Sequence, residues 1–325
     1  MESSRALAME GAESETNPTT AVLDVTVLMG GPSAEREVSL LSGRAVADAL
    51  ARRGHHVTRA DIFPHDTAAL DREGIDVVFI ALHGEFGESG EVQELCEQRG
   101  LRYIGSGPRA SRLALDKAAT KQAAKRLGLA TPDWMILEAF HSPEQIAAWL
   151  PELDVPVVVK PVDGGSSLDV TIARTHEARD AAVDEMLDRY GRALLERFVP
   201  GREMTVGILG EGALDVLEVV PKREFYDYAA KYADESGTEY TFDHGLGAAT
   251  VDALRASAVA IHEALGCRDL SRVDFLLDAS GAAWLLEINT IPGFTSHSLL
   301  PMAAARAGIG FDELCDRLAR MAMAR

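Results

Sequence analysis

The sequence has no long hydrophobic run and no cluster of basic residues. Its apolar stretches, such as 77–82 and 155–159, fall far short of the roughly 20 residues that a membrane-spanning helix needs. Lys and Arg number 32 against 51 Asp and Glu, which gives a formal net charge of −19. An acidic chain without a basic patch is a poor partner for nucleic acid or an anionic membrane. We therefore expect neither nucleic acid nor a membrane among its partners.

Cysteine is also scarce. The three cysteines, Cys96, Cys267 and Cys315, stand far apart without a Cys-x-x-Cys pair. Neither a disulfide framework nor a zinc site is indicated, and a reduced cytoplasmic protein is the better expectation. Residues 1–20 are small, polar and acidic and lack the basic start and apolar core of a secretory signal. We interpret them as a disordered tail.

What is present is a chain of average globular composition, long enough for two or three packed units. Short apolar strands alternate with helical patterns through residues 21–105, which predicts a parallel, doubly wound sheet. Residues 106–199 are predicted to form a central α+β unit. Residues 200–325 are predicted to form a C-terminal unit with a β-hairpin and two closing helices.

The hairpin gives the strongest chemical signal. Its strands, 271–277 and 284–289, flank an Asp-Ala-Ser-Gly turn, and a turn centred between Ser280 and Gly281 would place Asp274 opposite Glu287 and Arg272 opposite Asn289. Two facing carboxylates repel each other unless a cation lies between them. Oxygen ligands of this kind suit Mg²⁺ or Mn²⁺. Taken alone, the pattern also fits a solvated polar face.

A second signal follows the apolar strand 155–160, which delivers Lys160 into the glycine- and serine-rich stretch 163–167. Glycines let backbone N–H groups approach phosphate oxygens, and serine hydroxyls add donors. The sequence matches no Walker A pattern. A phosphate-binding loop and an ordinary hairpin loop both remain open at this point.

Two further segments lie where doubly wound sheets place ligands, at the carboxyl ends of the strands. Residues 30–39 carry Glu37, which could bind an ammonium group or could merely favour a helix N-terminus. His83 follows the strand 76–82, where a histidine serves either a substrate or the structure. The Tyr-rich stretch 225–232 lacks periodicity, as a lid does.

Four strings in this order resemble the D-alanine:D-alanine ligase family of the ATP-grasp superfamily. They are GGPSAEREVS at 30–39, ALHG at 81–84, FYDYAAKY at 225–232 and EINTIPGFTSHSL at 287–299, and the resemblance extends over about 22–318. It implies an ATP-grasp fold preceded by a doubly wound (pre-ATP-grasp) parallel-sheet domain. Residues 21–105 would then be the substrate domain, 106–199 the central ATP-grasp subdomain, and 200–325 the C-terminal subdomain with the metal site and lid.

The resemblance implies a ligase that joins two D-alanine molecules to D-alanyl-D-alanine through an acyl phosphate, for peptidoglycan precursors, as a cytoplasmic homodimer. ATP would be held by Lys117, Lys160, Glu196, Phe198, Val199, Glu203 and Lys231, and two Mg²⁺ ions, or Mn²⁺, by Asp274, Glu287 and Asn289. The substrates would be bound by Glu37, His83, Arg272, Gly293, Ser298 and Leu299.

Five residues take catalytic roles by the same resemblance. Glu37 would anchor the first ammonium group, and Arg272 with the N–H of Gly293 would stabilise the tetrahedral oxyanion. Ser166 and Tyr232 would form the link that closes the lid and excludes water from the acyl phosphate.

The sequence departs from the family at two places. Asp169 stands in the phosphate loop where the family usually has glycine, and a carboxylate there could repel phosphate or oppose a positive φ. Residues 240–244 also differ from the usual stretch. Two alternatives are an ATP-grasp carboxylate–amine ligase with a different substrate and a non-catalytic nucleotide-binding paralogue.

Overall fold

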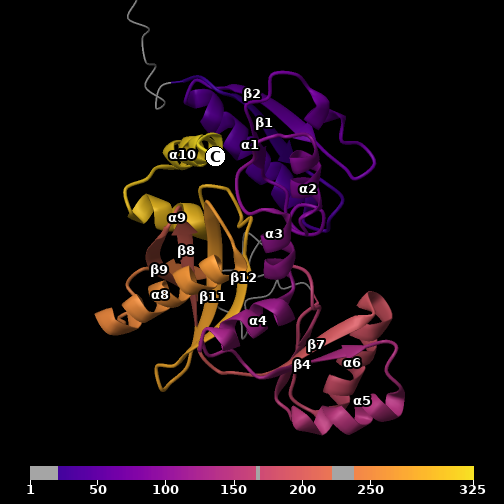
Figure 1. The fold of residues 1–325 in the computed structure, drawn as a ribbon. Coiled ribbons are helices and arrows are strands. Elements are labelled where there is room, and N and C mark those ends of the chain that lie inside the picture. The colour runs from indigo at the N-terminus through magenta and orange to yellow at the C-terminus, as the bar shows by residue number, and fades with distance from the viewer. Residues whose placement is uncertain (1–20, 166–168, 222–237) are drawn as a thin grey trace, which may run out of the picture.

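The computed structural model describes residues 21–165, 169–221 and 238–325. Figure 1 shows three groups of strands and helices: the first at the top, the last in the middle, and the central segment of the chain at the lower right. Each group is built around one sheet. In the described part of the chain, no helix combines the length and apolar character that crossing a membrane requires.

The first sheet is parallel, with strand order β2-β1-β3. Successive side chains of a strand point to opposite faces. Val25 and Val27 on β1 therefore join one core with α1, whereas Leu28 joins another that includes Val92 of α2. Helices on both faces confirm the doubly wound prediction. The elements are β1 (Asp24–Met29), α1 (Arg36–Arg52), β2 (His56–Asp61), η1 (Ala68–Asp71), β3 (Val77–Ile80) and α2 (Glu91–Gln98).

The last helix, α10 (Phe311–Met323), packs on this first sheet and beside α1 (Figure 1). Its Leu314 and Leu318 are fully buried in the core that contains Val25. Ion pairs join the same helices, among them Arg53 to Asp316 at 2.9 Å. The end of the chain thus covers its beginning, although the sequence assigned residues 200–325 to one C-terminal unit. The proposed boundaries themselves stay a prediction.

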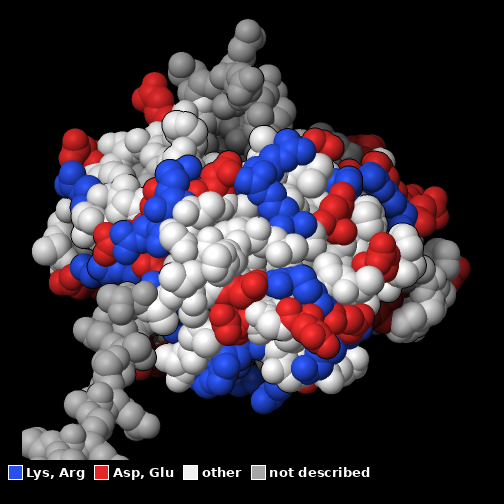
Figure 2. All heavy atoms as spheres, turned by 90° about the horizontal axis from the view of Figure 1, so that it is seen from above, with Lys and Arg blue, Asp and Glu red and all other residues white. Residues whose placement is uncertain are grey.

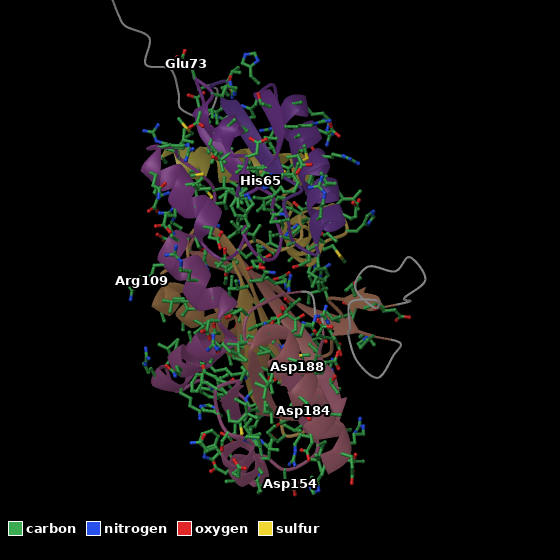
Figure 3. The ribbon with its side chains drawn as sticks, turned by 90° about the vertical axis from the view of Figure 1, so that its right-hand side faces the viewer. His65, Glu73, Arg109, Asp154, Asp184 and Asp188 are labelled. Atoms are coloured by element: carbon green, nitrogen blue, oxygen red, sulfur yellow. The ribbon has the colours of Figure 1, made fainter. Side chains whose placement is uncertain are left out.

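The central sheet is antiparallel, with order β4-β7-β5-β6. Ser142 and Gln145 form a reciprocal capping box that starts α5, and α6 ends at Gly191, whose φ of 70° suits glycine. Figure 3 shows Asp184 and Asp188 on the outer side of α6, so these acids face solvent. The elements are α3 (Pro108–Leu115), α4 (Lys117–Arg126), β4 (Trp134–Glu138), α5 (Pro143–Trp149), η2 (Leu150–Glu152), β5 (Val157–Lys160), β6 (Thr171–Ala173), α6 (His176–Tyr190) and β7 (Arg192–Arg197).

The third sheet is antiparallel, with order β10-β9-β8-β11-β12. Leu254 and Ile261 of α8 pack against Val273 and Phe275 of β11, so the helix covers one face of the sheet. The other face carries the polar hairpin residues. The elements are β8 (Arg202–Leu209), β9 (Gly212–Val220), β10 (Glu239–Thr241), α8 (Ala248–Leu265), β11 (Leu270–Leu277), β12 (Ala283–Asn289) and α9 (Leu299–Arg306).

The charged surface is mixed on the face seen from above. Figure 2 shows Lys and Arg interleaved there with Asp and Glu. The net charge of −19 therefore does not gather into one acidic block on this face.

Candidate active site

A cavity of about 900 Å³ is lined by the second and third sheets and by loops of the first. Its volume is at the upper end of the range for small-molecule sites, roughly 300–1,000 Å³. The cavity gathers most of the residues that were predicted to hold ATP and metal. These are Lys117, Lys160, Glu196, Phe198, Val199, Glu203, Asp274 and Glu287.

The hairpin β11–β12 has the predicted pairing at the site. Arg272 is the register partner of Asn289, and Asp274 that of Glu287. Nearer the turn, however, Leu277 pairs with Ala283. The strand pairing there is centred on Ser280, whereas the predicted centre was between Ser280 and Gly281. A register shift between Asp274 and Phe275 restores the predicted pairing.

This irregularity is a β-bulge at Leu286, the extra residue on β12. Leu285 and Ile288 are both buried in the core, which strict alternation would not allow for residues three apart. Because of the bulge, Leu286 and Glu287 both line the cavity. The bulge therefore turns the second carboxylate of the hairpin towards the site.

Asp274 is held firmly before any ligand arrives. Arg272 donates two hydrogen bonds to its carboxylate, from Nε to Oδ1 at 2.9 Å and from an NH₂ group to Oδ2 at 2.8 Å. Thr205 Oγ1 on β8 donates to Oδ1 at 2.6 Å. A bidentate guanidinium pair of this kind fixes the position and orientation of a carboxylate.

The donor set is compatible with a hard divalent cation. Asp274, Glu287 and the Asn289 amide are oxygen donors on paired strands. Within the described residues there is no group of three or more Asp, Glu, His or Cys placed to enclose a metal. Mg²⁺ commonly binds through one or two carboxylates and completes its sphere with water and substrate phosphates. The residues present fit that mode of binding.

Glu196 on β7 is the most strongly charged point of the cavity wall. Its side chain is buried, yet two lysines contact it: Lys160 Nζ lies 2.5 Å from Oε1 and Lys121 Nζ 2.7 Å from Oε2. Burial alone would raise the pKa of this carboxyl, but the two lysines outweigh burial and lower it to about 2. Glu196 is therefore ionised at neutral pH.

Lys121 was not predicted as a site residue. Its side chain is completely buried on α4, and burial lowers its pKa to about 8, against the opposing effect of Glu196. It stands four residues after Lys117, so both side chains project from the same face of the helix. That spacing was the available signal, because a lysine on the inward face of a helix needs a buried anion.

Lys117 joins the glycine-rich loop to the hairpin. Its Nζ donates to the carbonyl oxygen of Gly164 at 2.5 Å and lies 3.8 Å from Glu287 Oε2. Burial lowers its pKa, and Glu287 opposes the shift. The ammonium group thus lies where loop and hairpin meet.

The loop after β1 places Glu35, not Glu37, at the cavity. Glu37 is exposed on the first turn of α1, whereas Glu35, one residue before the helix, is 6% exposed and lines the cavity. Glu35 Oε2 lies 2.8 Å from where a Cβ on Gly84 would stand and 3.1 Å from that of Gly165. A side chain at either glycine would force the Glu35 carboxylate to shift. Glu35 is therefore the carboxylate that the fold places at the cavity, and a substrate contact of Glu37 stays a prediction.

His83 is buried, and both of its ring nitrogens form hydrogen bonds inside the protein. Nδ1 lies 3.1 Å from the carbonyl oxygen of Ile291, which can only accept, so Nδ1 carries the proton. Nε2 then accepts from Ser42 Oγ at 3.0 Å. His83 thereby connects α1 to the loop after β12. Its contact with substrate stays a prediction.

Gly293 and Ser298 lie in the loop before α9 and Leu299 is the first residue of that helix, apart from the residues that line the cavity. Ser298 Oγ accepts from the N–H of Thr295 at 3.1 Å. A Cβ on Gly293 would stand 3.0 Å from Ser298 Oγ, so glycine permits the close turn. Their predicted substrate contacts stay predictions, as do those of Ser166, Lys231 and Tyr232, which lie outside the described residues.

Asp169 adopts the conformation that the sequence analysis questioned. Its φ is +55°, in the left-handed region that favours glycine. Its carboxylate turns to α6, where Arg189 lies at 2.8 Å and the Tyr190 hydroxyl donates to it. The negative charge next to the loop is thus balanced by Arg189.

Comparison with known families identifies the architecture. A family model described as D-ala D-ala ligase C-terminus matches residues 123–320, and one described as D-ala D-ala ligase N-terminus matches residues 63–106. The chain belongs to the D-alanine–D-alanine ligase family.

The likeness to members of this ligase family extends over nearly the whole chain. The D-alanine–D-alanine ligase of Syntrophotalea carbinolica is 44% identical over 294 residues, covering 90% of this chain and 94% of that protein. The structure of the Bacillus anthracis ligase complexed with ATP has 29% identity and a TM-score of 0.81, over 94% of this chain and 98% of that one. These matches confirm the predicted family and fold class.

A ligase of different specificity is similar as well. The VanG D-Ala:D-Ser ligase of Enterococcus faecalis has 26% identity and a TM-score of 0.80, covering 92% of this chain and 98% of that chain. The fold of this ligase family therefore accommodates more than one second substrate.

Proposed function

We propose that this chain is an ATP-dependent D-alanine–D-alanine ligase that makes D-alanyl-D-alanine for peptidoglycan precursors. Family membership supports the reaction class, and the relative complexed with ATP supports use of that nucleotide. The observation that carries the proposal to this chain is the cavity, which brings Lys117, Lys160 and Glu196 together with the hairpin carboxylates Asp274 and Glu287.

ATP occupies this cavity. Glu196 lies near the end of β7, and Phe198 and Val199 follow that strand. These three residues line the adenine end of the cavity, and Glu203 on β8 takes the ribose. Lys117 and Lys160 bind the phosphates, with Lys231 from the lid segment. Cationic groups at fixed positions neutralise the charge that develops on the transferred phosphoryl group.

Asp274, Glu287 and Asn289 would hold Mg²⁺, two ions in all, or Mn²⁺. Such ions would supply Lewis-acid chemistry for the transfer of the phosphoryl group. Arg272 and Thr205 hold the Asp274 carboxylate in position for that purpose.

In the first half-reaction, a carboxylate oxygen of one D-alanine attacks the γ-phosphorus, the bond to ADP breaks, and an acyl phosphate forms. Glu35 anchors the ammonium group of this first substrate from the rim of the cavity. A carboxylate in that position holds the substrate by its charge and directs its carboxyl end towards ATP.

In the second half-reaction, the amine of another D-alanine attacks the acyl carbon and phosphate leaves. Arg272 and the N–H of Gly293 stabilise the tetrahedral oxyanion. Ser298 and Leu299, at the N-terminus of α9, bind the carboxylate of this second substrate, where helix N–H groups favour an anion. His83 positions the loop that holds them, and Ser166 and Tyr232 link the lid over the site.

We further propose that the enzyme works in the cytoplasm as a homodimer, and that 21–105, 106–199 and 200–325 are its substrate, central and C-terminal domains. The family resemblance supports the dimer, and the sedimentation of the purified protein tests it.

The deciding assay is release of ADP in the presence of ATP and Mg²⁺, with products identified by mass. The substrates are D-alanine, L-alanine, D-alanine with D-serine, and D-alanine with D-lactate. We expect turnover with D-alanine alone to give D-alanyl-D-alanine. Preference for a mixed pair would support a ligase with a different substrate. ATP binding without turnover on any substrate would support a non-catalytic paralogue.

A further inference from the structure

Lys121 has no part in the reaction as proposed, yet it is the only completely buried lysine among the larger buried side chains of the described residues. Its side chain is 0% exposed, and Glu196 Oε2 lies 2.7 Å from its Nζ. Isolated charges are very costly to bury, so a fully buried cation is retained only with an anion. The partner here is a residue of the proposed adenine pocket.

The lysine cannot move away from this partner. Its Nζ donates to Thr131 Oγ1 at 2.9 Å, and that hydroxyl donates to the carbonyl oxygen of Leu285 at 2.8 Å. Leu285 immediately precedes the bulge that turns Glu287 to the site. Lys121 is thus tied both to the adenine wall and to β12.

The second cation on Glu196 has another task. Lys160 lies 2.5 Å from Glu196 Oε1 and is proposed to bind phosphate. When phosphate oxygens share that ammonium group, the carboxylate depends more on Lys121. Burial without a cation would favour the neutral carboxyl, which donates a hydrogen bond as well as accepting one.

We propose that Lys121 is a positioning residue for nucleotide selection, which holds the Glu196 carboxylate in place as a pure hydrogen-bond acceptor. A pure acceptor is complementary to the amino group on the edge of adenine and repels the carbonyl oxygen that guanine carries there. Glu196 lines the cavity, and Lys121 Nζ lies 2.7 Å from its Oε2, so this lysine fixes the orientation of the carboxylate. This inference rests on the proposed adenine pocket.

The test measures KM and kcat for ATP and GTP with saturating D-alanine, in the full-length enzyme and in Lys121→Met. The hydrogen bonds of a charged group are typically worth enough to change binding about tenfold or more. We expect KM for ATP to rise at least about tenfold, kcat to change less than about threefold, and the preference for ATP over GTP to fall.

Lys125→Met is the matched control. Lys125 lies one turn further on the same helix and also contacts the Trp134 ring, at 4.4 Å from its centroid, but its side chain is 55% exposed. Its pairing with Asp133, at 3.7 Å, lies outside the cavity lining. We expect this variant to keep both KM values and the nucleotide preference.

A double-mutant cycle separates positioning from stability. Glu196→Gln removes the anion that pairs with Lys121, and Lys121→Met combined with it removes the buried ammonium group left without that partner, so that Lys160 is the one charge remaining in the cluster. If Lys121 acts through Glu196, the double variant binds ATP no more weakly than Glu196→Gln, and this comparison stands even if Lys121→Met alone fails to fold.

Two results would overturn the inference: additive losses in the cycle, or an unchanged preference in folded Lys121→Met. Calorimetric binding of ATP and GTP without D-alanine supplies the same comparison independently of ligation. A wild-type enzyme that binds ATP but does not ligate would refute the proposed reaction and leave the role of Lys121 testable.

Discussion

Glu35 and Glu37 offer a sharp test of the substrate site, because they stand two residues apart in one motif and differ in burial. Glu35 is 6% exposed and lines the cavity, whereas Glu37 is exposed on α1. Removing one partner of a buried ion pair costs roughly 3–5 kcal/mol. At 1.36 kcal/mol per factor of ten, the lower end of that range corresponds to about a hundredfold.

Glu35→Gln is therefore expected to lower kcat/KM for D-alanine about a hundredfold or more, because the amide keeps the shape and loses the charge. The KM for ATP should change little. Glu37→Gln should stay within about twofold, as is usual for an exposed charge. The assay is ADP release at varied D-alanine and saturating ATP, with thermal unfolding to check the fold. A large loss in Glu37→Gln together with normal activity in Glu35→Gln would refute this assignment.

Three further predictions concern metal, loop and pH. Asp274→Asn should reduce ADP release at millimolar Mg²⁺ with the fold intact. The loss should exceed the roughly 10–100-fold that removing a residue hydrogen-bonded to a metal ligand costs. Asp184→Asn on the outer side of α6 is the control, and full activity of Asp274→Asn would refute the metal assignment. Asp169→Ala should unfold about 1 kcal/mol more easily than Asp169→Gly in urea, because both variants lose the Arg189 contact but only alanine keeps a strained φ, and equal stabilities would contradict this. Burial lowers the pKa of His262 in the folded protein below its value in the unfolded chain. As the pH falls below about 6.5, the unfolded chain therefore takes up a proton at His262 before the folded protein does. The contribution of neutral His262 to the free energy of unfolding is present above that pH and is lost as the pH falls towards the folded pKa. His262→Gln should flatten that part of the stability profile, and an unchanged slope would argue against it.

The sequence predicted the hairpin correctly at the site for a reason that was only partly right. Alternation and the turn residues indicated that Asp274 faces Glu287, and the register agrees. The turn is centred on Ser280, however, and the bulge at Leu286 compensates for the difference. A bulge has no recognisable repeat in the sequence. It forms here because Leu285 and Ile288 can both be buried in the core only with an extra residue between them.

Sequence patterns do not distinguish Glu35 from Glu37, because residues 30–39 resemble a helix start. Glu35 precedes the first helical residue, so helical periodicity says nothing about its direction. Its carboxylate lies close to Gly84, which follows β3 of the same unit, and to Gly165, which follows β5 of the central unit. Only the folded arrangement brings those glycines together.

The partner of α10 could not be predicted either. The helix is strongly amphipathic in sequence, and this pattern indicates a buried side without naming what covers it. Leu314 and Leu318 in fact join the core of the first sheet. The prediction of two closing helices is confirmed, whereas their grouping with 200–325 stays a prediction.

The return of α10 to the first sheet has a consequence for synthesis in the cell. While residues 311–323 are still inside the ribosome, one face of the sheet that contains Val25 and Val27 lacks the helix that shields it. The N-terminal unit, although translated first, therefore cannot finish its core until the last helix emerges. Exposed apolar sheet surface is prone to aggregation, so the nascent chain should depend on holding chaperones until this helix has emerged.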